Sequence, residues 1–180
     1  SCRYIDIDMV KDDNDIAIIS FLPKQQSQKL KHIYRTKNII CCTPEYIKKF
    51  GLLESIDDLN QHKTVTAILQ DGMIVDQGFL FNNATDEMIS SFPVPVSVAT
   101  NDSALALELI YSDDFISFAS ESYVHNSLAD RKLIRLLPQY HLGYNDMYLL
   151  RNIDIDDIRY KKFVEFVESC LIKFDRDRLR

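Results

Sequence analysis

The stretch NIICCTPEYIKKFGLLESIDDLNQH, residues 38–62, contains the strongest local structure signals in the chain. Its apolar first residues predict a buried strand. Thr43 can cap a helix, and Pro44 suits the first helical position because no backbone donor is needed there. Gly51 can adopt the left-handed conformation that ends a helix. The stretch therefore predicts a strand that leads directly into a short helix between Pro44 and Gly51.

A second capped turn and further strands follow this helix. Ser55, with Asp58 three residues later, is another helix-start signal. Residues 64–69 are rich in β-branched side chains and predict a strand, and residues 75–81 are a candidate to pair with it. Residues 93–100 predict one more strand, which runs straight into a helix.

The rest of the chain continues the alternation of strands and helices. Additional strands are predicted at 4–10, 15–19, 33–42, 115–119, 133–138 and 148–150, and helices at 104–111, 123–129 and 154–174. The run at 15–19 has the uniform apolar character of a strand buried on both faces. The last helix carries apolar side chains at a 3.6-residue period, namely at Phe163, Phe166, Val167, Cys170, Leu171 and Phe174, and is expected to dock on the body of the protein. This alternation implies an α/β fold with mostly parallel sheets flanked by helices.

Composition limits the classes of function. The chain has 180 residues, enough for one domain or two small lobes, with 46% hydrophobic and 27% charged residues as in an ordinary soluble protein. Its net charge of −6 argues against binding of nucleic acid by this chain alone, because such binding depends on Lys and Arg. Membrane spans need about 20 consecutive apolar residues, and no run approaches that length. With no charged leader at the start, we expect a cytoplasmic protein, although an excised signal would leave no trace.

The cysteines are expected to be reduced and structural. The four of them, Cys2, Cys41, Cys42 and Cys170, are too few for a disulfide scaffold. Cys41 and Cys42 are neighbours in a strand, so their side chains point to opposite faces and share no site. Buried packing is the favoured interpretation of both thiols. An enzyme that uses Cys42 as a nucleophile beside a helix start remains an alternative, which thiol titration can test.

The sequence gives no reason to expect a metal or a cofactor. The histidines His32, His62, His125 and His141 are scattered, without a second ligand at the spacing of a zinc site. With only four glycines the chain has no glycine-rich phosphate loop, so nucleotide binding has no support.

Several segments, in order, resemble the effector-binding domain of LysR-type transcriptional regulators. The strand, Pro-initiated helix and Asp-Leu-x-x-His turn of residues 38–62 resemble the start of that domain's second lobe. Further similar segments are the Asp-Ile-Ala-Ile strand from Asp15, the Asn-Asp helix start at Asp102, the Leu-Leu-Pro strand in 133–140, and the strand 148–150 with its Phe-x-x-Phe helix. Each segment is weak evidence, but their order covers nearly the whole chain.

The resemblance implies a two-lobed, periplasmic-binding-protein-like fold with a small effector held between the lobes. By this resemblance the first lobe combines residues 1–34 and 138–180, and the second lobe is 35–137. The chain departs from the family pattern because it lacks a helix between Val10 and Asp15 and a strand and helix before Tyr4. It also has residues 114–116 in place of a Gly-x-Gly turn and Ser20 where Arg is common.

Candidate effector-binding residues follow from the geometry of such lobes. In open α/β sheets a ligand lies beyond the carboxyl ends of the strands, where helix starts offer unpaired N–H groups. Ordinary helix capping explains part of the same pattern, and an aromatic residue within a strand suits the core as well as a pocket. The predicted effector-binding residues are Thr100, Asn101, Asp102, Ser103, Ser20, Phe21, Ser117 and Phe118.

The function that the resemblance implies is sensing a small molecule to control transcription, without enzymatic activity. The expected partners are an unknown effector, a second copy in a homodimer or tetramer, and DNA through an N-terminal helix-turn-helix absent from this chain. No membrane partner is expected. A solute-binding protein of a transport system, which has the same two-lobed fold, is the alternative. A signal peptide upstream of Ser1 would favour transport, and a helix-turn-helix there would favour regulation.

Overall fold

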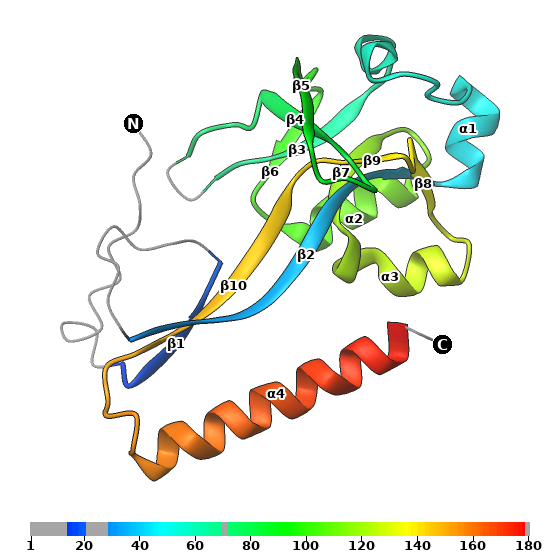
Figure 1. The fold of residues 1–180 in the computed structure, drawn as a ribbon. Coiled ribbons are helices and arrows are strands. Elements are labelled where there is room, and N and C mark those ends of the chain that lie inside the picture. Colours follow the sequence, from blue (N-terminus) through cyan, green and yellow to red (C-terminus); the bar gives the residue numbers. More distant parts are fainter. Residues whose placement is uncertain (1–13, 21–28, 70–71, 179–180) are drawn as a thin grey trace. The chain divides into compact units, whose positions relative to one another are not determined.

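The computed structural model describes residues 14–20, 29–69 and 72–178, with side chains as far as residue 172, so the predicted strand 4–10 lies outside the described residues. The chain divides into two compact units. The central unit runs from Thr36 to Tyr144, and the terminal unit combines the described residues before Thr36 with those from Asn145 onward. The chain passes between the units twice, within strand β2 (Leu30–Cys42) and at the start of strand β10 (Tyr144–Arg151) (Figure 1). The predicted lobe boundaries stay a prediction.

The main sheet of the central unit mixes parallel and antiparallel pairing. Its strands, in spatial order, are β2, β7 (Ile116–Ser120), β3 (Thr64–Ala67) and β6 (Val98–Thr100), and β8 (Ile134–Leu136) also pairs with β2. Strand β3 is parallel to β6 and β7, whereas β2 is antiparallel to β7 and β8. The sheet therefore has less parallel pairing than predicted, because β2 runs opposite to β7 and β8.

A second, antiparallel sheet of the central unit consists of β5 (Met88–Pro93), β4 (Gln77–Asn82) and β9 (Tyr140–His141) in that order. The prediction that 75–81 pairs with 64–69 is wrong for β4, which pairs with β5 and β9 instead. Only the start of the segment meets β3, where Val75 N donates to Ala67 O over 2.9 Å. The Phe92 ring packs directly on Gly78, which leaves no room for a Cβ atom and ties β4 to β5.

The local signals for helix starts and ends are confirmed. Helix α1 (Pro44–Phe50) has Thr43 as its cap, whose hydroxyl accepts a bond from the N–H of Tyr46, and Gly51 follows with φ of 87°. The short 3-10 helix η1 (Ile56–Gln61) starts with a capping box between Ser55 and Asp58.

Two more helices of the central unit lie close to their predicted positions. Helix α2 (Ser103–Tyr111) is capped by Asp102, whose carboxylate accepts from the N–H groups of Ala104 and Leu105. Helix α3 (Glu121–Ala129) follows β7 directly and begins two residues earlier than predicted.

Hydrophobic side chains cover both faces of the main sheet. One face carries Ile39 and Cys41 against α2 and α3, as in the cluster with Ile110, Val124 and Leu133. The other face carries Ile40 and Cys42 against α1, η1 and the β4–β5 hairpin, as in the cluster with Tyr46, Leu53, Leu59, Leu80 and Phe92. The two adjacent thiols therefore belong to different clusters, which confirms that they share no site.

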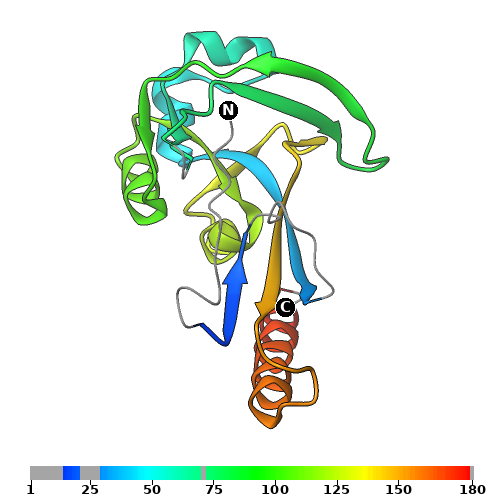
Figure 2. The same cartoon turned by 90° about the vertical axis from the view of Figure 1, so that its left-hand side faces the viewer.

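The terminal unit is a small antiparallel sheet with one long helix. Strand β1 (Ile16–Ile19) pairs with β10, and β10 neighbours β2 (Figure 2). Ile19 and Leu150 form its buried cluster, but Ile18 is 44% exposed, so the strand is not buried on both faces as predicted. Among the described strands, β1 is the last one of its sheet.

Helix α4 (Ile158–Arg178) buries less of its surface than predicted. It buries Tyr160 and Val167, whereas Phe166 is 63% exposed and Cys170 is exposed, contrary to the predicted apolar stripe. The helix begins four residues later than predicted because Asp157 N donates to Asp154 O in a preceding turn.

Candidate functional site

The carboxyl ends of three parallel strands meet at one edge of the central sheet. Ala67 is paired with Thr100 in the β3–β6 register, and Val65 is paired with Ser117 in the β3–β7 register. The ends of β3, β6 and β7 therefore lie side by side, followed by the starts of α2 and α3. We call this the carboxyl edge. It is the place where α/β sheets bind ligands.

The predicted residues at the end of β6 are at this edge. The hydroxyl of Thr100 accepts from the N–H of Asp102 over 3.0 Å, and Thr100 O accepts from Ile68 N over 2.9 Å. The side chains of Asn101 and Ser103 are exposed. The Asp102 carboxylate accepts from two N–H groups at the start of α2, so it stabilises the helix while its neighbours remain accessible. These four predicted residues are consecutive in the sequence, and the structure places the segment at the carboxyl edge.

A cluster of hydroxyls at the end of β7 was not predicted. The hydroxyl of Thr36, which is buried, accepts from the N–H of Ser122 over 3.1 Å and from the hydroxyl of Ser120 over 3.5 Å. Ser120 and Ser122 place their Oγ atoms 3.1 Å apart. Because β7 ends at Ser120 and not at residue 119, these side chains stand at the carboxyl edge. The signal that could have found them is the Ser-Glu-Ser sequence between a strand and a helix.

The remaining predicted residues lie elsewhere. Ser117 is buried within β7, where its hydroxyl donates to Val65 O over 3.4 Å, and Phe118 packs against the cluster of Ile40 and Leu80. Ser20 follows β1 in the terminal unit and is exposed. Phe21 lies outside the described residues. The effector-binding role of all these side chains stays a prediction.

A charged cluster lies next to the start of α3. Arg135 donates to Glu121, the first residue of α3, over 3.0 Å, and also to Tyr140 O over 2.8 Å. Lys37 donates to Asn83 in the β4–β5 turn, and Asn83 also accepts from Arg135. The buried Nε atom of Arg135 has no hydrogen-bond partner in the described part of the chain. The sequence signal for Arg135 is a single charged residue between apolar neighbours in β8.

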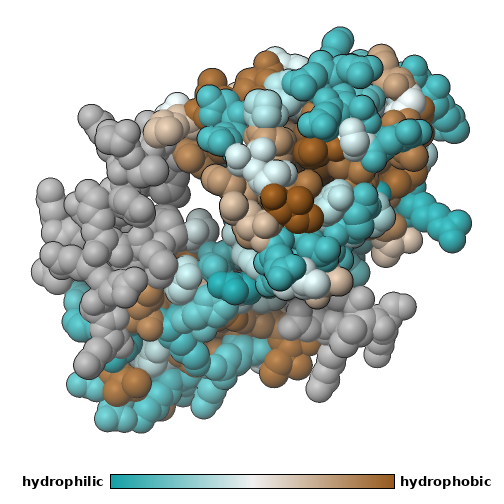
Figure 3. Space-filling model, turned by 45° about the horizontal axis from the view of Figure 1, so that its top comes forward, coloured by the Kyte–Doolittle hydropathy of each residue, from teal (hydrophilic) through white to brown (hydrophobic). Residues whose placement is uncertain are grey.

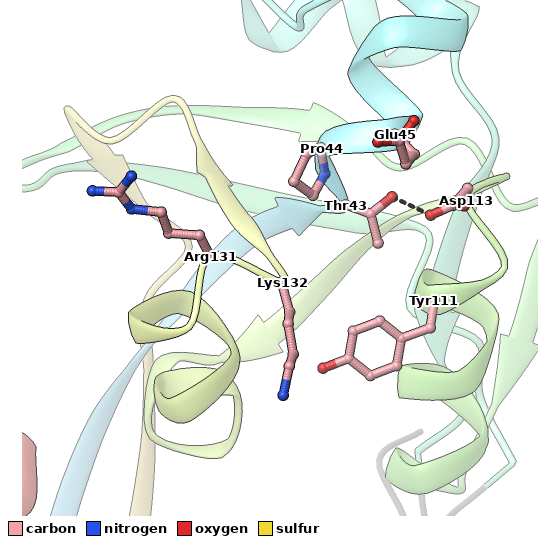
Figure 4. Close-up of a pocket in the computed structure, with 7 residues that line it drawn as sticks. All are labelled: Thr43, Pro44, Glu45, Tyr111, Asp113, Arg131 and Lys132. Carbon is pink, nitrogen blue, oxygen red and sulfur yellow. Dashed lines mark hydrogen bonds between the residues drawn. The ribbon is translucent and has the colours of Figure 1, made fainter.

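The opposite, amino edge of the sheet has an open hollow of about 450 Å³. Because Cys41 of β2 is paired with Ser117 of antiparallel β7, Thr43 lies beyond the amino end of β7. Figure 4 shows the Tyr111 and Lys132 side chains extending into the same space while Arg131 turns away. The lining residues are Thr43, Pro44, Glu45, Tyr111, Asp113, Arg131 and Lys132, and none of them is a predicted effector-binding residue.

The two adjacent cysteines of β2 are not activated thiols. Burial raises the pKa of the Cys41 thiol to about 12, with the neighbouring Cys42 as a second cause, and burial raises the pKa of Cys42 to about 12. Both thiols are therefore protonated near neutral pH. Within residues 14–20, 29–69 and 72–178, no three His, Cys, Asp or Glu side chains are grouped so that they could hold a metal ion.

The chain belongs to the family of LysR substrate-binding domains, whose family model matches residues 6–170. It is 26% identical over 165 residues to the HTH-type transcriptional activator TtdR of Escherichia coli strain UTI89, covering 91% of this chain and 51% of that protein. The chain thus spans about half the length of the curated relatives it matches.

Solved structures with the same fold belong to regulators. CrgA, a LysR-type transcriptional regulator from Neisseria meningitidis, has a TM-score of 0.72 and 20% identity over 92% of this chain and 55% of its own. The full-length virulence activator AphB of Vibrio cholerae has a TM-score of 0.71 and 17% identity over 90% of this chain and 54% of its own.

These matches identify an effector-binding regulatory domain of a bacterial LysR-type transcriptional regulator, a family of non-enzymatic transcription factors. The transport and Cys42 enzyme alternatives are therefore set aside. In the described part of the chain, no helix is long and apolar enough to cross a membrane.

Proposed function

We propose that the full-length regulator senses a small polar molecule at the carboxyl edge of the central sheet and changes its binding to DNA in response. The observation that supports this most directly is the meeting of the Thr100–Ser103 segment with the Thr36, Ser120 and Ser122 hydroxyls at one edge. Two helices, α2 and α3, begin there with N–H groups and short polar side chains.

The site suits a ligand that both donates and accepts hydrogen bonds. Hydroxyls of Ser and Thr can act in either direction, and helix starts favour an acceptor such as a carboxylate. The hydroxyl of Ser120 lies 3.5 Å from that of Thr36 and 3.1 Å from that of Ser122, and both distances are long for bonds between hydroxyls, so a ligand can replace these two bonds at small cost. The guanidinium of Arg135 and the carboxylate of Glu121 adjoin this edge and would contribute charge.

The two lobes of the regulator are proposed to be the two compact units, with boundaries near 35/36 and 144/145 in place of the predicted 34/35 and 137/138. We also propose an effector-binding role for Ser20, which is exposed in the terminal unit, and for Phe21, which lies outside the described residues. An effector that binds one arrangement of the lobes better than another shifts the population by its differential affinity. That shift would be passed to an N-terminal helix-turn-helix, as the relative's description as an HTH-type activator suggests.

We also propose that the regulator acts in the cytoplasm, where its DNA is, as a homodimer or tetramer. Assembly would give the DNA-binding parts a defined spacing. Size-exclusion chromatography with light scattering on the full-length protein would establish the oligomeric state.

Isothermal titration of the 180-residue domain against a panel of small metabolites tests the site. Thr100→Ala, Asn101→Ala and Ser120→Ala should each weaken binding of any ligand found by roughly tenfold, the effect of one lost hydrogen bond in a desolvated site. Lys132→Ala, in the hollow at the amino edge, is the matched control and should leave affinity unchanged. If ligands bind and only Lys132→Ala weakens them, the carboxyl edge is the wrong site.

A further inference from the structure

Strand β5 is the outer strand of the second sheet and offers an open backbone edge. The order β5-β4-β9 leaves one side of β5 without a neighbouring strand among the described residues. In an antiparallel ladder, alternate N–H and C=O groups of an outer strand point away from its partner. The edge residues 88–93 therefore present hydrogen-bonding groups that another strand could use.

The outer face of the same hairpin is apolar. Leu80 and Phe92 point inward and are buried, whereas Phe79 is 48%, Met88 61% and Ile89 50% exposed. In Figure 3 the top of the view in Figure 1, which contains β4 and β5, is turned toward the reader. Hydrophobic side chains lie between hydrophilic ones on this surface. Large apolar side chains on an open strand are uncommon in soluble proteins unless they contact a partner.

Acidic side chains flank the two strands of this hairpin in the sequence, and Lys37 and Arg135 are the cations that contact its turn at Asn83. Residues 64–130 contain no Lys or Arg at all, but ten Asp and Glu. Asp76 precedes β4, and Asp86 and Glu87 precede β5, all with exposed side chains. Strand β5 carries no Lys, which commonly keeps an open strand from pairing, so its edge is limited only by Pro93 at its end and by the register shift opposite Leu80 and Phe81.

The negative charge at the hairpin turn is maintained by local contacts. The Tyr144 hydroxyl donates to the Asp86 carboxylate, and His141 Nε2 lies 2.8 Å from it. These bonds, with Tyr144 as the larger cause, lower the pKa of Asp86, so this carboxylate is ionised at neutral pH. The nearby ammonium group of Lys37 is engaged with Asn83.

We propose that the open edge of β5 takes up an extended segment of a partner protein with alternating apolar and basic side chains. Strand addition would satisfy the backbone groups, the apolar side chains would cover Phe79, Met88 and Ile89, and Lys or Arg would face the acidic rim. A second copy of this chain fits less well, because pairing two β5 strands would bring acidic rims together. This surface is distinct from the carboxyl edge, so the proposal does not depend on the effector site.

The test uses the full 180-residue chain and three labelled ten-residue peptides in fluorescence anisotropy. One peptide alternates Val and Lys, the second alternates Val and Glu, and the third is the Val–Lys peptide with two central Pro residues that prevent strand pairing. The Val–Lys peptide should bind at least roughly tenfold more tightly than either of the others, and 0.5 M salt should weaken it.

Substitutions in the protein test whether the Val–Lys peptide binds to the β4–β5 hairpin. Ile89→Lys and Ser91→Lys should each weaken the Val–Lys peptide by at least roughly tenfold, since a charge on the strand repels it and protects the edge. Leu105→Lys, at a 49% exposed side chain on α2 over the other face of the main sheet, carries the same change and should have no effect. Amide shifts in nuclear magnetic resonance spectra should concentrate in residues 88–93.

Equal binding of the Val–Lys and Pro-containing peptides, or a Val–Lys affinity unaffected by both hairpin variants, would refute strand addition. Light scattering that shows self-association abolished by Ile89→Lys would identify a second copy as the occupant and overturn the basic-partner proposal.

Discussion

The two edges of the central sheet use their polar side chains differently. At the amino edge the hydroxyl of Thr43 donates to Asp113 over 2.7 Å, and Tyr111 Oη lies 2.6 Å from Ser127 Oγ. At the carboxyl edge the side chains of Asn101 and Ser103 are exposed. The amino edge therefore uses its polar groups to hold helices together. The carboxyl edge leaves more of them accessible. The hollow of about 450 Å³ is at the amino edge, but the accessible polar groups are at the carboxyl edge, so a hollow alone does not identify a binding site.

The largest difference between the edges should appear in stability. Thr43→Val removes a buried helix cap and the bond to Asp113, so the free energy of unfolding should fall by about 2–3 kcal/mol. Thr100→Val at the carboxyl edge should cost less than about 1 kcal/mol, because only one local bond is lost. Urea denaturation of both variants makes the comparison, and equal losses would contradict the assignment of the edges.

Substitutions at the carboxyl edge should affect ligand affinity more than they affect stability. The double variant Ser120→Ala with Ser122→Ala should weaken a ligand found by titration roughly tenfold, which is about 1.4 kcal/mol. Its unfolding free energy should change by less than about 0.5 kcal/mol, because the N–H of Ser122 still donates to Thr36. A loss of stability as large as the loss of affinity would indicate a structural role for the hydroxyls.

A smaller effect is expected at the contact between α2 and α3. Tyr111→Phe deletes the hydroxyl paired with Ser127 and should lower the unfolding free energy by about 1 kcal/mol. Tyr123→Phe is the matched control, since Tyr123 is 51% exposed, and should stay within about 0.5 kcal/mol of the parent. Thermal or urea unfolding measures both, and identical values would show that the Tyr111 bond adds nothing.

The smallest effect concerns pH. Bonds from the backbone and side chain of Ser55 are the largest causes that lower the pKa of Asp58 below its ordinary value of 3.8. A lowered pKa means that the stabilisation is present above the unfolded value and is lost as the pH falls below it. Asp58→Asn should therefore flatten the decline of the urea midpoint between about pH 5 and pH 3. An unchanged slope would show that the capping box does not contribute.

The local structure of the segment that connects β6 to α2, which is one part of the candidate site, could be predicted from the sequence. A β-branched strand followed by Asn-Asp and an Ala- and Leu-rich run predicts a helix start at residues 100–103, and the structure confirms that start. The cap of α1 was found for the same reason. Such signals depend on hydrogen bonds within four residues, so the sequence is enough to interpret them.

The other half of the site depends on strand register. Thr36 meets Ser120 and Ser122 only because Asn38 is paired with Ser120 across two strands more than eighty residues apart in the chain. The same pairing buries Ser117 within β7 and leaves Phe118 half-buried, and the predicted effector-binding role of both residues stays a prediction.

The sequence by itself determined the caps of the helices, the buried thiols on opposite strand faces and the family to which the chain belongs. All of these rest on short patterns whose hydrogen bonds or side-chain alternation are local. Only the tertiary structure decided that β4 pairs with β5, that Phe79 and Ile89 remain exposed, and that hydroxyls from β2 and β7 meet. Those outcomes depend on which distant strands become neighbours, and that is selected by the packing of whole surfaces.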